Sequence, residues 1–304
     1  MTMAGTKEIK ARIESVQETK KITNAMYLIA STKLRRARQE LNNTRPYFEA
    51  LRGEIKRIFR TAADVDSRYF YPSSGEKPLT GTYACLVITA DKGLAGAYNQ
   101  NAIRQALQLL EQHPDTKLFV VGEYGRRFFT RQGIPIEHSF LYTAQNPTMA
   151  RAREISALLL DGFNKGELQK IFVVYTDMQK GSVFEAHTTR ILPFHRTFFT
   201  SSGEEIAQTE RGPRFEFVPD ARAVLDSMVP SYVSGFIYSA LIDSFCCEQN
   251  ARMTAMDSAD RNAEKLLGEF SLRYNRVRQA AITQEITEVS AGAKAQKQKH
   301  KKER

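Results

Sequence analysis

Two very long helical patterns, one near each end of the chain, constrain the fold more than any other feature of the sequence. Apolar residues recur at helical spacing from Ile9 to Phe59 and again from Ala221 to about Ser290, with few interruptions by proline or glycine. Runs of roughly 50 and 70 residues are far longer than ordinary globular helices and are typical of a coiled coil. Both runs lead into the same middle segment, so we expect the two helices to pair antiparallel.

The end of the second run, residues 278–293 (RQAAITQEITEVSAGA), is apolar on two opposite sides. Val277, Ala280 and Ala281 fall on one side, and Ile282, Ile286 and Val289 fall on the other. Pairing about 50 residues with about 70 leaves roughly 20 residues, or about 30 Å, beyond the shorter helix. Because both apolar sides need cover, we predict that another protein encloses this segment.

Residues 80–218, between the two runs, alternate between strand and helix patterns. The strand patterns are 82–90, 117–122, 171–178 and 183–193, and the helical patterns are 99–113, 123–133 and 148–163. This alternation predicts a small α/β domain with mostly parallel strands. Two turn-rich segments, 71–81 and 201–213, are expected to be loops.

The predicted fold class is therefore α/β, with a long antiparallel coiled coil of N- and C-terminal helices bracketing a small Rossmann-like α/β domain. The expected parts are an N-terminal coiled-coil helix (1–60), a globular α/β domain (61–218), a C-terminal coiled-coil helix (219–293) and a tail (294–304). The net charge is +10, and the tail KAQKQKHKKER is rich in Lys and Arg. Such an end is expected to be solvated and disordered.

Cysteine usage and hydropathy point to a reducing compartment. Cys85, Cys246 and Cys247 have neither a disulfide framework nor the CxxC spacing of a redox or zinc site. The first residues lack the apolar region of a secretory signal, and no run of about 18 apolar residues predicts a membrane span. We expect a cytoplasmic protein, or one held at a membrane by other proteins.

Motifs for catalysis or ligand binding are weak. The segment 89–100 (TADKGLAGAYNQ) connects a strand to a helix, as phosphate loops do, but it lacks GxGxxG and GxxxxGK[ST] and is predicted to be a tight turn. The five histidines lack metal-ligand spacing, and no nucleophile motif is present, so we expect no cofactor, metal or catalytic residue. The basic run 33–39 (KLRRARQ) favours a solvated face or an acidic protein surface over nucleic acid, because no aromatic stacking platform accompanies it.

Four blocks of sequence carry a resemblance to a known family. ITQEITEVSAGAKA (282–295) contains a full C-terminal signature, at Ile282, Thr283, Glu285, Glu288, Gly292 and Ala293. The other blocks are IKARIESVQETKKITNAM (9–26), ADKGLAGAYN (90–99) and ARMTAMDSADRNA (251–263). Together they resemble the gamma subunit of the bacterial F-type ATP synthase, and the resemblance extends to about Ala295.

The resemblance implies a non-catalytic rotor subunit of a proton-translocating two-sector ATPase. In this family the coiled coil stands inside a ring of alternating alpha and beta subunits, and its tip turns in an apolar collar. The α/β domain and the lower end of the coil form a foot on the epsilon subunit and the membrane ring of c subunits. Rotation of the c ring then takes each catalytic beta site through the conformations in which ATP is made and released.

The resemblance also implies which residues contact the alpha and beta subunits. They are Met26, Lys33, Arg35, Arg36, Arg252, Gln279, Ile282, Thr283, Glu285, Ile286, Glu288 and Val289. Arg252 and Gln279 are the expected polar contacts to the moving segment of beta, which Met26 and Thr283 also face. The basic residues from Lys33 onward are expected to meet acidic groups there.

The chain departs from the family pattern in three places. Val218 precedes Pro219 where a Glu is common, residues 27–32 differ from the usual Glu-, Met- and Ala-rich sequence, and the tail is longer than usual. The chloroplast-type insertion is absent and no transit peptide precedes the first helix. We expect a peripheral subunit on the cytoplasmic side of a bacterial inner (plasma) membrane.

Two other functions remain open from the residues alone. An α/β nucleotide-binding enzyme with a helical arm would bind nucleotide as an isolated chain. A basic coiled-coil nucleic-acid-binding protein would bind DNA with a steep salt dependence, even without residues 294–304. The shaft function predicts instead that deleting the tip from Val277 onward weakens assembly.

Overall fold

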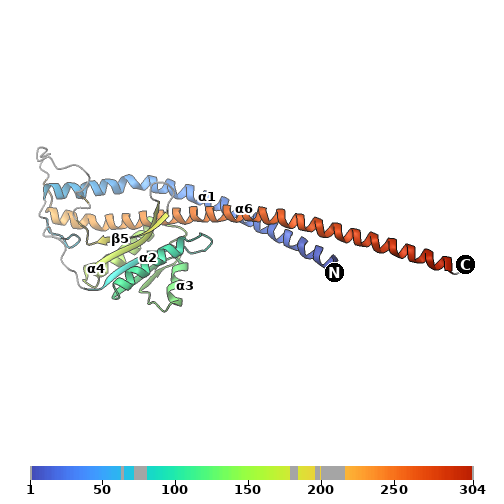
Figure 1. The fold of residues 1–304 in the computed structure, drawn as a ribbon. Helices are drawn as coiled ribbons and strands as arrows, with labels where there is room; N and C mark the ends of the chain where they lie inside the picture. Colours follow the sequence, from blue (N-terminus) through green and yellow to red (C-terminus); the bar gives the residue numbers. More distant parts are fainter. Residues whose placement is uncertain are drawn as a thin grey trace. The chain divides into compact units, whose positions relative to one another are not determined.

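The computed structural model of the protein describes residues 2–62, 65–71, 81–178, 184–195, 199 and 216–302. The chain forms two compact units, one made of Met1–Ile29 with Met253–Arg304 and the other of Ala30–Arg252. We call the first the coil unit and the second the α/β unit. The two longest helices, α1 (Thr2–Thr61) and α6 (Ala221–Lys302), contribute residues to both units (Figure 1).

The α/β unit is built on a five-stranded sheet with the strand order β3-β2-β1-β4-β5. The strands are β1 (Tyr83–Ile88), β2 (Thr116–Val121), β3 (His138–Phe140), β4 (Lys170–Met178) and β5 (Phe184–Leu192), and three helices connect them: α2 (Tyr98–Gln112), α3 (Glu123–Arg131) and α4 (Met149–Asn164). The first four strands pair in parallel, and β5 at one edge is antiparallel to β4. This arrangement confirms the predicted Rossmann-like α/β fold.

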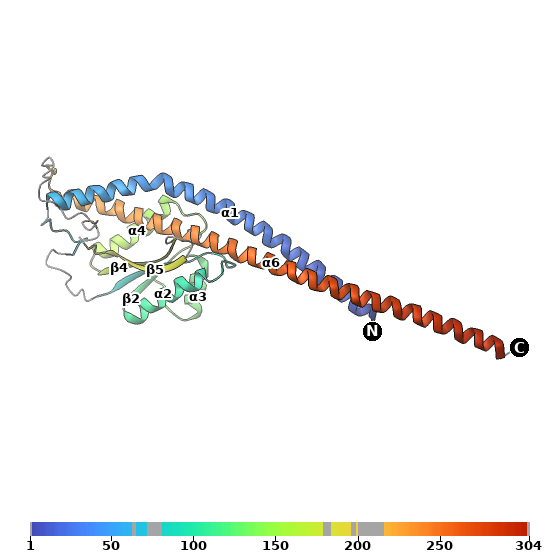
Figure 2. The ribbon, with the colours of Figure 1, turned by 45° about the horizontal axis from the view of Figure 1, so that its top comes forward.

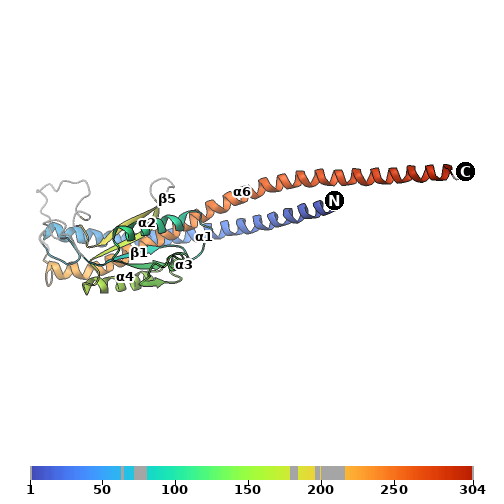
Figure 3. The same ribbon diagram turned by 60° about the horizontal axis from the view of Figure 1, so that its bottom comes forward.

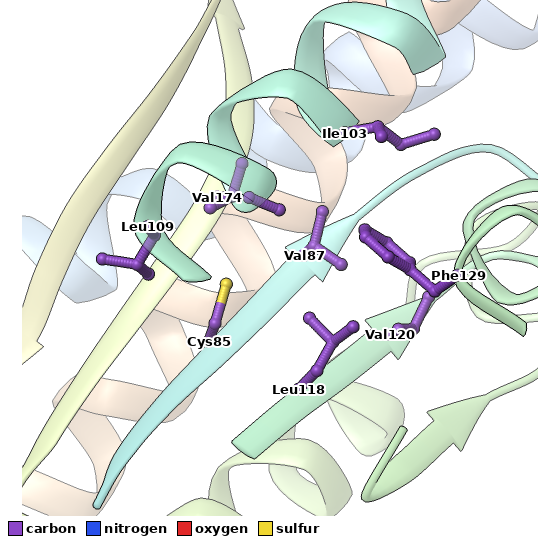
Figure 4. Close-up of a cluster of buried hydrophobic side chains, with 9 residues drawn as sticks. Cys85, Val87, Ile103, Leu109, Leu118, Val120, Phe129 and Val174 are labelled. Carbon is purple, nitrogen blue, oxygen red and sulfur yellow. The ribbon is translucent and has the colours of Figure 1, made fainter. Parts of the chain in front are cut away.

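Both faces of the sheet are covered. The helices α2 and α3 cover one face around an apolar cluster (Figure 4) made of Cys85, Val87, Ile103, Ala106, Leu109, Leu118, Val120, Phe129 and Val174. The first part of α6 runs along the opposite face (Figure 2), where the rings of Tyr175 on β4 and Phe236 on α6 lie 5.9 Å apart. Because β1 is buried on both faces, its sequence is continuously apolar rather than alternating.

In the coil unit, α1 and α6 pair antiparallel (Figure 3). Lys20 Nζ of α1 lies 2.5 Å from a carboxylate oxygen of Glu264 and 3.9 Å from one of Asp260, both on α6. One stripe of buried and half-buried positions on each helix alternates in steps of three and four: Thr6, Ile9, Ile13, Val16, Lys20 and Thr23 on α1, and Met256, Asp260, Ala263, Leu267, Phe270, Tyr274, Val277 and Ala281 on α6. This spacing is the heptad pattern of a coiled coil, as predicted. Outside this stripe, Met26, Met253, Ala255, Asp257 and Ala259 are also half-buried.

The heptad stripe of α1 differs in detail from the apolar pattern of the sequence. Ile22 and Ile29 belong to the apolar pattern, yet their side chains are 61% and 56% exposed. The stripe passes instead through Lys20 and Thr23, because the long aliphatic stem of a lysine can cover apolar surface while its charge reaches a carboxylate.

Other differences concern short or terminal segments. The three-residue strand β3 was not predicted, since it is too short to show a periodic pattern. The helix α6 continues to Lys302, whereas we expected a disordered tail from Lys294. Lys, Gln and Ala have high helix propensity and extend an existing helix at little cost. The expected loops 71–81 and 201–213 lie almost entirely outside the described residues.

Gly122, between β2 and α3, allows a close approach of two backbone segments. Its φ is +95°, and a Cβ atom there would lie 2.3 Å from the carbonyl oxygen of Thr89. Gly133 also has a positive φ, of +70°, but a Cβ atom there would have nothing within 4 Å. Both glycines would strain the backbone if replaced by alanine, but only Gly122 would also bring a Cβ atom into steric overlap. Comparing alanine substitutions at the two positions therefore distinguishes the two costs.

We expect Gly122→Ala to destabilise the chain more than Gly133→Ala. The alanine at 133 should cost about 1–2 kcal/mol, the strain of a positive φ alone, whereas the alanine at 122 must also displace the backbone of Thr89. Urea unfolding of the two variants and the parent chain measures the difference. Equal losses in the two variants would contradict the proposed overlap.

Asp243 of α6 is a largely buried carboxylate. Burial raises its pKa to about 7, the Asp177 carboxylate of β4 adds to the shift, and Arg45 of α1 and the side chain of Ser239 oppose it. The folded chain thus holds the proton of Asp243 more tightly than the unfolded chain does.

The free energy of unfolding should therefore contain a part that depends on the pH through Asp243. This part is fully present below the unfolded pKa of about 4 and is lost as the pH rises through the folded pKa. Asp243→Asn should remove it and stabilise the chain at pH 8, by on the order of 4 kcal/mol. Urea unfolding at pH 5 and pH 8 tests this, with the exposed Asp161→Asn as control. An Asp243→Asn chain that keeps the parental pH dependence would refute the assignment.

Candidate protein-interaction site

The exposed end of α6 in the coil unit is the first candidate surface. Every residue from Ile282 to Lys294 is exposed. The side chains of Ile282, Ile286 and Val289 are 45%, 61% and 73% exposed and recur at the i, i+4 and i+7 spacing of one helix side. Val277 and Ala281, on another side of the helix, are half-buried. Of the two predicted apolar sides, the one with Val277 and Ala281 is half-buried, although Ala280 is exposed, and the one with Ile282, Ile286 and Val289 is uncovered.

The polar side chains of this tip form hydrogen bonds within their own helix. Thr283 Oγ1 donates to the carbonyl oxygen of Gln279 (2.9 Å), and Thr287 Oγ1 donates to that of Thr283 (2.7 Å). Gln284 Nε2 donates to Glu288 Oε1 (2.9 Å). Hydroxyls that bond to their own helix are less available to an outside partner. The predicted residues Gln279, Thr283, Glu285 and Glu288 are all exposed, but the contact surface that they surround is mainly aliphatic.

Further exposed apolar residues lie on α1 in the coil unit and were missed by the sequence analysis. Ile22 and Ile29, at i and i+7, share one side of the helix and are 61% and 56% exposed, and Leu28 (58%) and Tyr27 (36%) lie on other sides. The predicted contact residue Met26 is half-buried. A signal was present in the sequence, because three successive large apolar residues at 27–29 cannot all face one partner helix.

The basic run lies on the part of α1 that belongs to the α/β unit. Lys33, Arg35 and Arg36 are exposed. Arg36 Nε lies 3.1 Å from Glu40 Oε1, but the Arg36 side chain is 82% exposed, so this pair contributes little to stability. These cations are positioned on a rigid helix and remain accessible to an acidic partner.

Arg252 was expected to make a polar contact with the beta subunit, but its side chain is buried. Its residue exposure is 8%, and its Nη2 lies 2.6 Å from an oxygen of the equally buried Glu248. The same nitrogen donates to the carbonyl oxygens of Gly93 (3.0 Å) and Lys92 (3.4 Å). The guanidinium is therefore engaged inside the α/β unit. Glu248 was not a predicted residue, since nothing in a helical sequence marks a buried ion pair.

The geometry of residues 89–97 favours the predicted tight turn over a phosphate loop. Leu94 and Gly96 have positive φ values of 63° and 54°. The turn directs two carbonyl oxygens, those of Lys92 and Gly93, at the guanidinium of Arg252. A phosphate loop directs N–H groups at its ligand instead.

Within the described residues, no group of three or more His, Cys, Asp or Glu side chains is placed to hold a metal ion. None of the described helices is both long and apolar enough to cross a membrane. Val218, the residue before Pro219, is 85% exposed.

The sequence is similar to those of known proteins along nearly its whole length. The family model described as ATP synthase matches residues 5–296. The ATP synthase gamma chain of Caldanaerobacter subterraneus is 40% identical over 294 residues, which cover 95% of this chain and 99% of that protein. The gamma chain of Acetobacterium woodii, named as sodium ion specific, is 35% identical and covers 95% of this chain and 97% of its own length.

The fold also matches chains of solved mitochondrial ATP synthase structures. A chain of the Euglena gracilis mitochondrial ATP synthase (OSCP/F1/c-ring, rotational state 3) superposes with a TM-score of 0.67 at 17% identity, covering 96% of this chain and 94% of its own. A chain of the rotor of the same enzyme in rotational state 1 gives 0.63 at 16% identity, covering 92% and 99%. The full-length match to the family model and to curated relatives establishes that this chain belongs to the ATP synthase gamma chain family.

Proposed function

We propose that the chain is the central rotor shaft of an F-type proton-translocating ATP synthase. It is a non-catalytic subunit that couples rotation of the membrane c ring to conformational cycling of the catalytic beta subunits. Membership of the gamma chain family supports this function. The main structural support for this function is the uncovered aliphatic side of α6 at Ile282, Ile286 and Val289. An exposed apolar surface of this kind marks a site that another protein covers.

The chemistry of the tip suits a bearing. A shaft that turns must avoid one deep energy minimum, so its contacts should be non-directional. Aliphatic contacts meet this requirement, because hydrophobic burial does not depend on a fixed angle between two groups. The internal hydrogen bonds of Thr283 and Thr287 leave few directional contacts for the sleeve.

The proposed contacts to the alpha and beta subunits follow from these surfaces. They are Met26, Lys33, Arg35, Arg36, Gln279, Ile282, Thr283, Glu285, Ile286, Glu288 and Val289, together with Ile22, Leu28 and Ile29. Arg252 is not included, because its guanidinium is engaged inside the α/β unit. Residues 1–60 and 219–293 serve as the coil, 61–218 as the foot on epsilon and the c ring, and 294–304 as a basic extension.

The chain belongs to a membrane-associated complex. We place it as a peripheral subunit on the cytoplasmic side of the cell inner membrane, attached through the c ring. A nucleic-acid-binding function is not favoured, since the chain belongs to the ATP synthase gamma chain family.

The first test is co-purification of the tagged full-length chain from detergent-solubilised host membranes. We expect recovery of alpha and beta subunits with ATPase activity.

The double variant Ile286→Asp with Val289→Asp should lower the affinity for the alpha/beta ring by at least about tenfold, because each aliphatic side chain that becomes buried contributes about 1.5–3 kcal/mol. The unfolding of the isolated chain should stay unchanged, since both positions are exposed. The matched control is Leu158→Asp, an exposed leucine of α4. Parental affinity of the double variant, or recovery of the chain without alpha and beta, would refute the shaft function.

The basic run predicts a different kind of effect. Replacing Lys33, Arg35 and Arg36 by Gln should slow association with the alpha/beta ring by about tenfold at low salt, because opposite charges steer encounter. The effect should fade at high salt. The rate of ATPase recovery after mixing measures it, with the exposed cations Arg104, Arg131 and Lys165 replaced by Gln as control. Equal slowing in both triple variants would show a general charge effect.

A further inference from the structure

The connection between α6 and the turn at residues 92–93 is buried and polar. The side chains of Arg252 and Glu248 are 10% and 7% exposed and form an ion pair of 2.6 Å. From this pair, Arg252 Nη2 donates to the carbonyl oxygens of Gly93 and Lys92, at 3.0 and 3.4 Å. A buried guanidinium held by a carboxylate on its own helix has little freedom to choose other partners.

Hydrogen bonds also hold the turn that follows β1 to neighbouring parts of the α/β unit. Asn99 Oδ1 accepts from the backbone N–H of Ala90 (2.9 Å), and Asp91 Oδ1 accepts from that of Glu123 at the start of α3 (2.9 Å). The carbonyl oxygen of Ala90 accepts from the N–H of Tyr124 (3.0 Å). A displacement of the turn would therefore disturb the carboxyl ends of β1 and β2 and the beginning of α3.

Apolar packing at the same place is of a different kind. Ala90, Ala95 and Tyr98 pack with Cys247 of α6 in a small buried cluster. Such contacts hold two elements together but oppose rotation of a helix about its own axis only weakly, because they lack a preferred angle. The hydrogen bonds from Arg252 depend on direction, so they resist this rotation.

Arg252 is also the last residue of the α/β unit along α6, since the coil unit resumes at Met253. The guanidinium thus holds the helix at the point where it leaves the unit that carries the foot. We propose that Glu248, Arg252 and the carbonyl groups of Lys92 and Gly93 form a latch that locks α6 against axial rotation relative to the α/β unit. This inference rests on the shaft function proposed above.

In a rotor, the latch makes Arg252 a positioning residue for coupling. Ser244 and Ser234 of α6 are also hydrogen-bonded within the α/β unit, to the backbone N–H of Thr176 and to the hydroxyl of Ser156. The latch is the last of these directional contacts before α6 leaves the unit, and without it part of each rotation is lost as slippage of the helix at this end. Arg252 then acts inside its own subunit, and the catalytic subunits need not touch it.

The test uses the assembled complex with the double variant Arg252→Met/Glu248→Leu. Both charges are replaced by apolar side chains of similar length, so the core stays filled and no buried charge is left alone. Arg252→Met alone is the second variant. The matched control is Lys165→Met with Asp161→Leu, an exposed pair of the same i, i+4 kind on α4. Two quantities are measured: hydrogen exchange of the amides at 92–96, and protons pumped per ATP hydrolysed in membrane vesicles.

We expect faster exchange at 92–96 and a loss of pumping per ATP in the double variant, with parental values for the control. Parental exchange in the double variant would overturn the latch, and so would faster exchange with parental pumping. A loss of pumping in Arg252→Met with parental exchange would also overturn it, since Arg252 would then act through a partner subunit. Absence of pumping by the parent complex would refute the shaft function instead, while the exchange data would still report on the contact.

Discussion

Heptad pairing between α1 and α6 is the interaction on which the rest of the structure depends. Its alternating steps of three and four residues bury one narrow stripe on each helix and leave most of the remaining surface uncovered. A narrow stripe is enough to hold two long helices together, because small contributions add up along the pair. Because the interface between the helices is narrow, the apolar side chains of Ile22, Leu28 and Ile29 remain exposed. The pairing therefore forms the coiled coil and also leaves apolar surface on it that a partner protein can contact.

The sheet of the α/β unit contacts α6 at two places. Along one face, Phe236 packs on Tyr175, and the backbone N–H of Thr176 on β4 donates to Ser244 Oγ of α6 (3.1 Å). At the carboxyl ends of the strands, the contact is polar and buried, through Arg252. In many Rossmann-like folds a ligand lies outside the carboxyl ends of the strands. Here a side chain of the protein's own helix contacts the turn that follows β1.

The elements with long periodic patterns were predictable from the sequence, and the details of their contacts were not. The strand β1 could be located because its apolar run ends at a glycine-rich turn, and α6 because its period persists over many turns. The aliphatic tip could also be predicted, since Ile286 and Val289 fall on one side of any helix at this position. The place of Arg252 was not predictable, because it depends on a turn some 160 positions earlier in the chain. Ile22 was misassigned because a lysine can occupy a heptad position as well as an isoleucine can.

The unequal lengths of the two helices have a mechanical consequence. Beyond Ala281 the rod consists of α6 alone, whereas before that residue it consists of two helices in contact. Resistance to twisting rises steeply with the cross-section of a rod, so a given load deforms the single-helix part most. Elastic deformation should therefore concentrate in the terminal segment, which can lag behind the paired part and recover when the load is released. The end of the shaft would then act as a soft torsional spring at the tip of a stiffer rod.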